Sequence, residues 1–242
     1  MKYCIPLFLI LSALSLSAQT LPYTQRLYCN LALDYTISAR VGRDFVHPIR
    51  DLARGTCWVV HFKGESLIIT AAHNLGLGPN FVPAPLYRAK SVALVSAPHL
   101  GVLAYTVADV GLPRGNADWI ALRPTESRAL ACSLTIQLSD TPSKVGESVT
   151  VIGFPDTAHE QRIERMITFI SPANDFIIFN QPLEPGYSGG VVLNTKNQAV
   201  GVVVTTGNKQ STALLLNGEN IADLKWRPFK EMQKRTVTLQ DR

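Results

Sequence analysis

The stretch CWVVHFKGESLIITAAH, residues 57–73, indicates which kind of fold this chain adopts. Residues 57–62 and 66–70 are rich in β-branched and aromatic side chains, which favour strands. Between them lies Lys63-Gly64, a pair that suits the tight turn of a β-hairpin. The stretch therefore predicts two antiparallel strands joined by a short turn.

The same pattern recurs along most of the chain. Gly, Pro, Asn and Asp stand between the apolar runs, as expected for turns, and Lys196-Asn197 predicts a second hairpin turn. We therefore predict an all-β fold, built as a sandwich or as barrels. The other predicted strands are residues 91–96, 101–107, 119–122, 133–138, 148–154, 165–170, 176–179, 190–193, 199–205 and 211–216.

Composition excludes several other classes of protein. The 242 residues are 46% hydrophobic and 17% charged, which is not the composition of a disordered chain. The 16 Gly and 15 Pro follow no period, which excludes collagen and argues against long helices. The net charge of +5 includes no run of five or six basic residues, so we expect no nucleic-acid partner.

The chain divides into a leader and two halves of similar size. Residues 1–18 have the pattern of a signal peptide: a basic start, a mainly apolar run from Ile5 to Leu16, and a small-residue exit. That run is shorter than the about 20 residues that a membrane span needs. We expect cleavage after Ser17 or Ala18 and a secreted or periplasmic protein with no membrane span; the alternative is a buried N-terminal strand.

The polar segment 124–131 contains no strand pattern and separates an N-terminal half, residues 19–130, from a C-terminal half, residues 131–242. One short helix is predicted near the end of the chain, within residues 220–233. Ile221, Leu224 and Phe229 could share one face there, although Pro228 interrupts the pattern.

The cysteines and histidines predict no metal site. Beyond the leader stand Cys29, Cys57 and Cys132, an odd number that allows at most one intramolecular disulfide. None has zinc-ligand spacing, and the five histidines do not cluster. The favoured interpretation is three small buried side chains, and we expect no cofactor.

Three short motifs carry residues that could perform chemistry. His73 follows a predicted strand and two alanines, which leave room for a neighbour on the imidazole. Asp118 precedes an apolar run, where a carboxylate needs a donor such as an imidazole N–H. Ser188 lies among glycines, which permit unusual dihedrals and let backbone amides point into one hole. Each motif alone is more often structural, and only their conjunction indicates a site.

The segments TAAH (70–73), DWIAL (118–122) and GYSGG (186–190) resemble the three active-site signatures of chymotrypsin-like serine proteases. The order His, Asp, Ser is that of the family. The resemblance extends over roughly residues 50–220. It implies two antiparallel six-stranded β-barrels with the active site in the cleft between them, His73 and Asp118 in the first and Ser188 in the second.

The resemblance also implies a role for each residue. Ser188 would be the nucleophile, His73 the general base and Asp118 the residue that orients the imidazole. The backbone amides of Gly186 and Ser188 would form the oxyanion hole. The resemblance implies a serine endopeptidase that acts on polypeptides, and we expect a monomer.

Two departures from the digestive enzymes of the family are informative. Asn74 follows the histidine, where those enzymes have a disulfide cysteine, and Tyr187 precedes the serine, where they have the aspartate used in activation. We therefore expect no trypsinogen-like activation. The pattern resembles the bacterial glutamyl endopeptidases and high-temperature-requirement proteases instead.

The predicted substrate pocket carries no charge. Pro182 stands where trypsins have an acid, and Val203 stands where glutamyl endopeptidases have a histidine. With Val204 and Thr205 as further walls, we expect a preference for small or medium uncharged residues before the scissile bond. Two other functions stay open: an inactive binding protein of the same fold, which the bulk of Tyr187 could favour, and an esterase with the same three residues.

Overall fold

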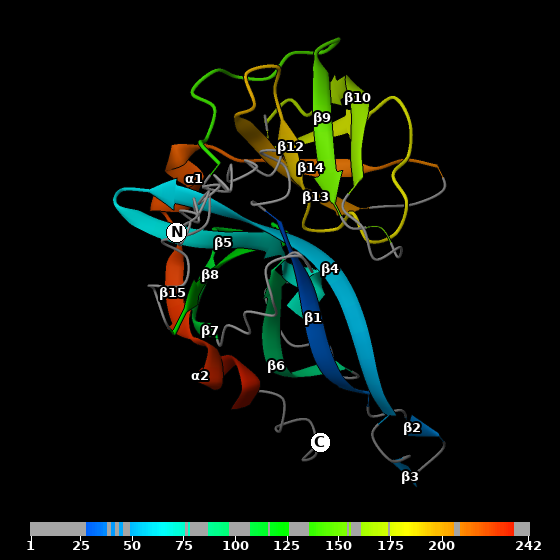
Figure 1. Cartoon of the computed structure of the whole chain (residues 1–242), viewed down its shortest axis with the longest axis vertical. Helices are drawn as coiled ribbons and strands as arrows, with labels where there is room; N and C mark the ends of the chain where they lie inside the picture. The colour runs from blue at the N-terminus through cyan, green and yellow to red at the C-terminus, as the bar shows by residue number, and fades with distance from the viewer. Residues whose placement is uncertain are drawn as a thin grey trace, which may run out of the picture.

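The computed structural model describes thirteen parts of the chain and shows an all-β fold with short helices (Figure 1). The predicted signal peptide and Cys132 lie outside the described residues, as do residues 126–131 of the predicted linker. The described residues are 28–37, 40–41, 44–45, 49–75, 77, 87–96, 107–115, 117–125, 136–153, 155, 161–173, 175–205 and 209–234.

A closed barrel of six antiparallel strands forms the upper part of Figure 1 and confirms the barrel expected for the second half. Buried aliphatic side chains such as Val149, Ile167 and Val192 fill its interior together with Tyr187. Closure leaves none of the six strands as an edge. In order around the barrel the strands are β10 (Gln161–Ile170), β11 (Phe176–Phe179), β14 (Thr212–Leu215), β13 (Ala199–Thr205), β12 (Val191–Leu193) and β9 (Ser148–Gly153).

Six strands of the first half and one strand from the end of the chain form a seven-stranded sheet, and a second six-stranded barrel is not confirmed in the described residues. A separate small hairpin joins β2 (Arg40–Val41) to β3 (Asp44–Phe45). The sheet runs in the order β15 (Lys225–Pro228), β7 (Val107–Leu112), β8 (Trp119–Pro124), β5 (Glu65–Ala71), β4 (Ile49–Phe62), β1 (Tyr28–Ile37) and β6 (Tyr87–Ser96).

Both predicted hairpin turns are confirmed. β4 and β5 are joined at Lys63-Gly64, where both residues have positive φ, 49° and 83°. β12 and β13 are joined through Asn197, at φ 58°. Most predicted strands within the described residues coincide with observed ones, but β1 was not predicted. Residues 101–106 and 133–135 of two predicted strands lie outside the described residues. Of the rest, Val107 begins β7, and residues 136–138 form only isolated bridges.

The prediction of one C-terminal helix within residues 220–233 is wrong for residues 225–228, which form a strand. Two short helices, α1 (Gly218–Ala222) and α2 (Phe229–Lys234), flank β15, which pairs with β7 at the edge of the first sheet. Gly111 leaves room for the Trp226 ring, and the Arg123 guanidinium lies 3.5 Å from that ring's centroid. These contacts hold residues 225–228 as a strand, and Pro228 is tolerated because β15 is an edge strand.

One buried apolar cluster continues from the first sheet into the barrel. Trp58 and Trp119 contribute from the sheet, and Ile152 and Val204 from the barrel. The favoured interpretation of the cysteines as merely small buried side chains does not hold for Cys57, which is buried but disulfide-bonded, as the odd cysteine count still allowed. Cys29 lies opposite it in the β1–β4 pairing. No helix in the described ranges is long and apolar enough to span a membrane.

Candidate active site

Sheet pairing places His73 next to Asp118. His73 lies in the 3-10 helix η2 (Ala72–Leu75), which begins directly after β5, and Asp118 directly precedes β8. β5 and β8 are neighbouring strands with Ala71 opposite Trp119, so the end of one meets the start of the other. The amide of Ala72 donates to the backbone carbonyl of Asp118 at 3.2 Å, which joins the two segments.

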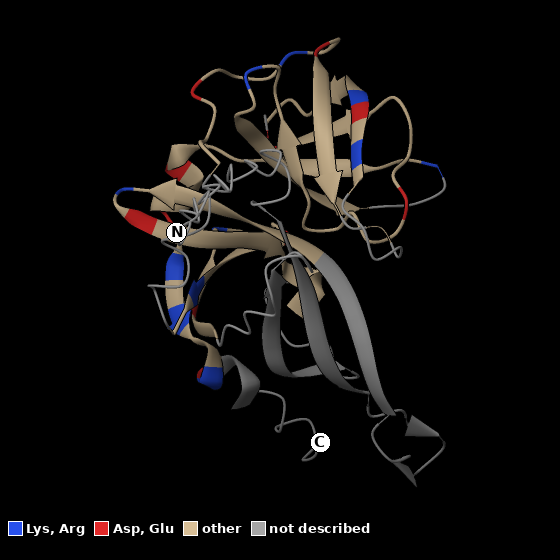
Figure 2. Cartoon of the chain, in the orientation of Figure 1, with Lys and Arg blue, Asp and Glu red and all other residues tan. Residues whose placement is uncertain are grey.

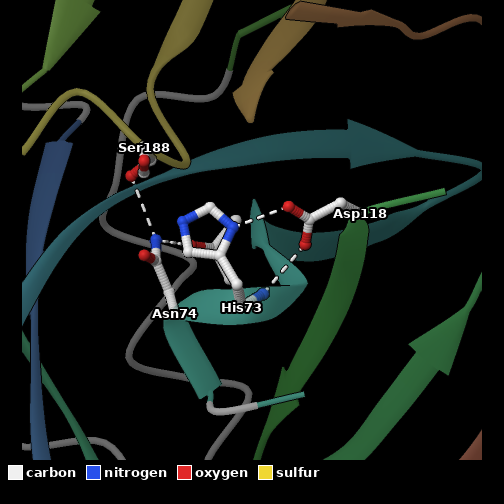
Figure 3. Close-up of polar contacts among 5 residues, drawn as sticks. His73, Asn74, Asp118 and Ser188 are labelled. Atoms are coloured by element: carbon white, nitrogen blue, oxygen red, sulfur yellow. Dashed lines mark hydrogen bonds and ion pairs between the residues drawn. The ribbon is translucent and has the colours of Figure 1, made fainter. Parts of the chain in front are cut away.

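Asp118 holds His73 at two atoms (Figure 3). Its Oδ2 lies 2.6 Å from Nδ1, and its Oδ1 accepts the backbone amide of His73 at 2.9 Å. Because a carboxylate only accepts, Nδ1 carries the proton in this contact, and in the neutral imidazole Nε2 then has the lone pair. The side chains are 42% and 38% exposed, so the imidazole is accessible to a ligand.

Ser188 lies in a tight loop between β11 and β12 that two glycines make possible. Gly186 and Gly189 have φ of 98° and 84°, a region that disfavours residues with a Cβ. The loop is tied to the barrel because the Gly189 amide donates to Val203 O at 2.7 Å, and the Val203 amide donates to Gly190 O at 2.8 Å.

The loop presents Ser188 over η2, on the side where Figure 3 shows His73 and Asn74. Within the described residues Ser188 Oγ makes no hydrogen bond to His73. Catalytic hydrogen bonds are often long before substrate binds, so this geometry is compatible with a nucleophile and its base.

Two backbone amides of the same loop, those of Gly186 and Ser188, differ from their neighbours in their hydrogen bonding. Gly189 and Gly190 donate their backbone amides to carbonyls of the protein. Among the described residues, no acceptor takes the amides of Gly186 and Ser188. Amides of a glycine-rich turn that have no protein acceptor can bind an anionic oxygen where they converge.

Tyr187 turns its side chain away from this site. The ring is 1% exposed and packs in the barrel core, so close to Gly153 that a Cβ there would lie 2.7 Å from Tyr187 Cδ1. The hydroxyl donates to Gln161 Oε1 at 3.4 Å, and burial raises the pKa of Tyr187 above its usual value. The bulky side chain therefore anchors the loop in the barrel.

The four residues of the predicted substrate pocket lie in different surroundings. Val203 is fully buried in the barrel core, whereas Val204 faces the cluster shared by the two halves. Thr205 is exposed, and so is Pro182, whose carbonyl accepts a hydrogen bond from Arg165. Their role as pocket walls stays a prediction.

Sequence reasoning missed three polar residues that contact the Ser188 loop from the first half. Asn74 Nδ2 donates to Ser188 O at 3.0 Å. The amide of Thr56 donates to the same oxygen at 2.9 Å, and its Oγ1 donates to Gly186 O. Thr70 Oγ1 links the other two. Thr56 lies within β4, Thr70 within β5 and Asn74 in η2, so no common local pattern in the sequence marked the three residues.

Comparison with protein families defines the class. The model of the trypsin-like peptidase domain matches residues 55–202, more than half of the chain. The chain therefore belongs to this family and is a serine endopeptidase. The resemblance to chymotrypsin-like serine proteases is confirmed.

Solved structures with the same fold include bacterial proteases. The Rv3671c protease from M. tuberculosis in its active form has a TM-score of 0.55 and 16% identity, over 83% of this chain and 81% of that one. The HtrA-type protease AlgW, solved with a decapeptide, has a TM-score of 0.56 and 14% identity, over 80% of this chain and 62% of that one. Comparison with curated protein sequences found no match.

Proposed function

We propose that the protein cleaves peptide bonds through an acyl-enzyme intermediate on Ser188, with His73 as general base and Asp118 as the residue that orients it. The observation that carries the proposal is the 2.6 Å contact between His73 Nδ1 and Asp118 Oδ2. It leaves the lone pair of Nε2 for the hydroxyl of a serine presented on the neighbouring loop.

The proposed reaction follows the acyl-transfer chemistry of a Ser-His-Asp triad. Ser188 Oγ attacks the substrate carbonyl and gives its proton to His73 Nε2, while Asp118 stabilises the imidazolium. The backbone amides of Gly186 and Ser188 donate hydrogen bonds to the developing oxyanion. His73 then protonates the leaving amine. In the second stage water gives a proton to His73 and attacks the acyl-enzyme ester, the bond to Ser188 Oγ breaks, and His73 returns the proton to Oγ.

The proposed substrate is a polypeptide with a small or medium uncharged residue before the scissile bond. This rests on Pro182 and Val203, at positions where charge-selective relatives of the family have ionisable side chains. A strong preference for Arg, Lys or Glu in a peptide library would contradict it.

Charged side chains are spread over turns and over β10 and β15 in the described part of the chain (Figure 2), a distribution unlike a nucleic-acid footprint.

We also propose that the protein is exported and acts as a monomer. The signal-peptide pattern of residues 1–18 supports export. N-terminal sequencing of protein recovered outside the cytoplasm should begin at Ala18 or Gln19, and light scattering should give the mass of one chain. Retention of residues 1–18 in the cell would contradict export.

The position of Tyr187 favours an enzyme over an inactive scaffold. Its side chain lies in the barrel core, and no protein acceptor in the described residues takes the amides of Gly186 and Ser188. The esterase alternative uses the same residues. Turnover of an ester substrate without turnover of the matched amide would favour it.

Labelling with a fluorophosphonate tests the proposal. The purified protein should form a single adduct at Ser188, located by peptide mass, and His73→Ala should abolish it. Ser66, whose Oγ lies 3.5 Å from Nδ1 of His61, is an internal control for a serine that merely lies near a histidine. Absence of an adduct in folded protein, or equal labelling of Ser66, would contradict the proposal.

A further inference from the structure

Asn74 connects the proposed base to the loop of the proposed nucleophile. It directly follows His73, and its side chain is buried, with 6% of the residue exposed. Its Nδ2 donates to Ser188 O at 3.0 Å and to Thr70 Oγ1 at 3.0 Å (Figure 3). One side chain on η2 therefore spans the boundary between the sheet and the barrel at the site itself.

The peptide bond that follows Ser188 is held from both halves of the molecule. Its carbonyl oxygen accepts from Asn74 Nδ2 and from the amide of Thr56, both in the first half. Its nitrogen, that of Gly189, donates to Val203 O on β13 of the barrel at 2.7 Å. With both polar ends of this peptide engaged, the backbone of Ser188, and with it the direction of its side chain, is restrained.

The contact surface on the first half is closely packed. Thr70 Oγ1 donates to Thr56 O at 2.8 Å and accepts from Asn74, which orients the Asn74 amide toward the loop. A Cβ on Gly189 would lie 2.0 Å from Thr56 O and 2.8 Å from Asn74 Nδ2. The loop can therefore approach Asn74 only because residue 189 is glycine.

We propose that Asn74 is a positioning residue that sets the orientation of Ser188 relative to His73, an inference that rests on the proposed function. The two reacting side chains come from different halves of the fold. Asn74 is joined to His73 by one peptide bond and to the Ser188 carbonyl by one hydrogen bond. A movement of one half relative to the other therefore changes the position of Ser188 relative to His73 only slightly. Asn74 makes no contact with the reacting atoms.

Saturation kinetics with a fluorophosphonate separate positioning from binding and from stability. The maximal rate of Ser188 phosphonylation, kinact, should fall about 10- to 100-fold in Asn74→Asp, which keeps the shape but removes the donor, and in Asn74→Ala. The half-saturating concentration KI should stay unchanged. Asn194→Ala is the matched control, because Asn194 is equally buried and binds Ser139 and the β12–β13 turn. It should lower the melting temperature and leave kinact at the wild-type value.

Thr70 supplies a second pair of variants that keeps the test decisive if the Asn74 variants do not fold. Thr70→Val removes the hydroxyl that orients Asn74 and should lower kinact, whereas Thr70→Ser keeps the hydroxyl and should restore it. Folded Asn74 variants with wild-type kinact, or Thr70→Val indistinguishable from Thr70→Ser, would overturn the inference while labelling of the wild type upholds the proposed function. A wild type that is not labelled at Ser188 overturns both.

Discussion

Asp118 contacts His73 through both of its carboxylate oxygens, one on the imidazole Nδ1 at 2.6 Å and one on the backbone amide at 2.9 Å. The second contact fixes the carboxylate relative to η2, so that the first can fix the plane of the ring. Orientation of the imidazole therefore depends on the pairing of β5 with β8, which brings the two residues together.

Asp118→Asn should lower kcat by about 10⁴-fold, the size of the loss when the orienting aspartate of a Ser-His-Asp triad becomes asparagine. The amide can still accept from the His73 backbone, but it can also donate to Nδ1 and so favour the wrong tautomer. Turnover of a peptide amide and the melting temperature should be measured together. Asp223→Asn, which alters an exposed ion pair with Arg114, is the control and should keep full activity.

Gly189→Ala should destabilise the protein far more than Gly64→Ala. Both glycines have nearly equal φ, 84° and 83°, so the conformational strain is matched at about 1–2 kcal/mol. A Cβ at Gly64 meets nothing within 4 Å, whereas one at Gly189 meets Thr56 O at 2.0 Å. We expect a loss of at least about 3 kcal/mol for Gly189→Ala in urea unfolding, together with loss of Ser188 labelling. Equal losses for the two variants would show that packing of the loop is unimportant.

Trp226→Ala should reduce the free energy of unfolding by about 2–3 kcal/mol. The ring packs over Gly111 and lies under the Arg123 guanidinium, which also forms a paired contact with Glu65. Removing it takes away the contact that holds β15 on the first sheet. Lys225→Ala, on the exposed side of the same strand, should change stability by less than about 0.5 kcal/mol. A small effect of Trp226→Ala would mean that pairing with β7 alone holds β15.

Tyr187→Phe should keep activity and change how stability depends on pH. The pKa of Tyr187 is raised from 10.0 first by burial and then by Glu184, with Arg165 acting in the opposite direction. A folded-state pKa above the unfolded value means that this stabilisation is complete below pH 10.0 and is lost as the pH rises through the folded pKa. The decline in unfolding free energy above pH 10 should therefore be smaller in Tyr187→Phe. Parallel declines in the two proteins would contradict this.

Local patterns were enough to predict most strands of the barrel and the two hairpin turns. Residues 199–205, for example, are β-branched and apolar nearly throughout, and Asn197 tolerates the positive φ that its turn requires. Residues 225–228 could not be assigned in this way. Their strand conformation depends on a partner about a hundred residues earlier in the chain, where Gly111 leaves space for Trp226.

The residues of the candidate site also differ in whether local sequence patterns could predict them. His73, Asp118 and Ser188 could be proposed from the conjunction of three short motifs, two with small residues beside a reactive side chain and one with a carboxylate before an apolar run. Asn74 could only be noted as a departure from related enzymes. Its partner, the carbonyl of Ser188, is a backbone atom 114 residues away, which carries no side-chain pattern.

The sequence by itself determined the all-β class, the turns and the identity of the three proposed catalytic residues, since these follow from local propensity and from side-chain chemistry. Only the tertiary structure decided which residues hold them in place: Asp118 against η2, Asn74 and Thr56 against the Ser188 loop, and Tyr187 in the barrel core. The physical reason is that these contacts join segments far apart in the chain, and several end on backbone carbonyls or amides, which every residue type provides alike.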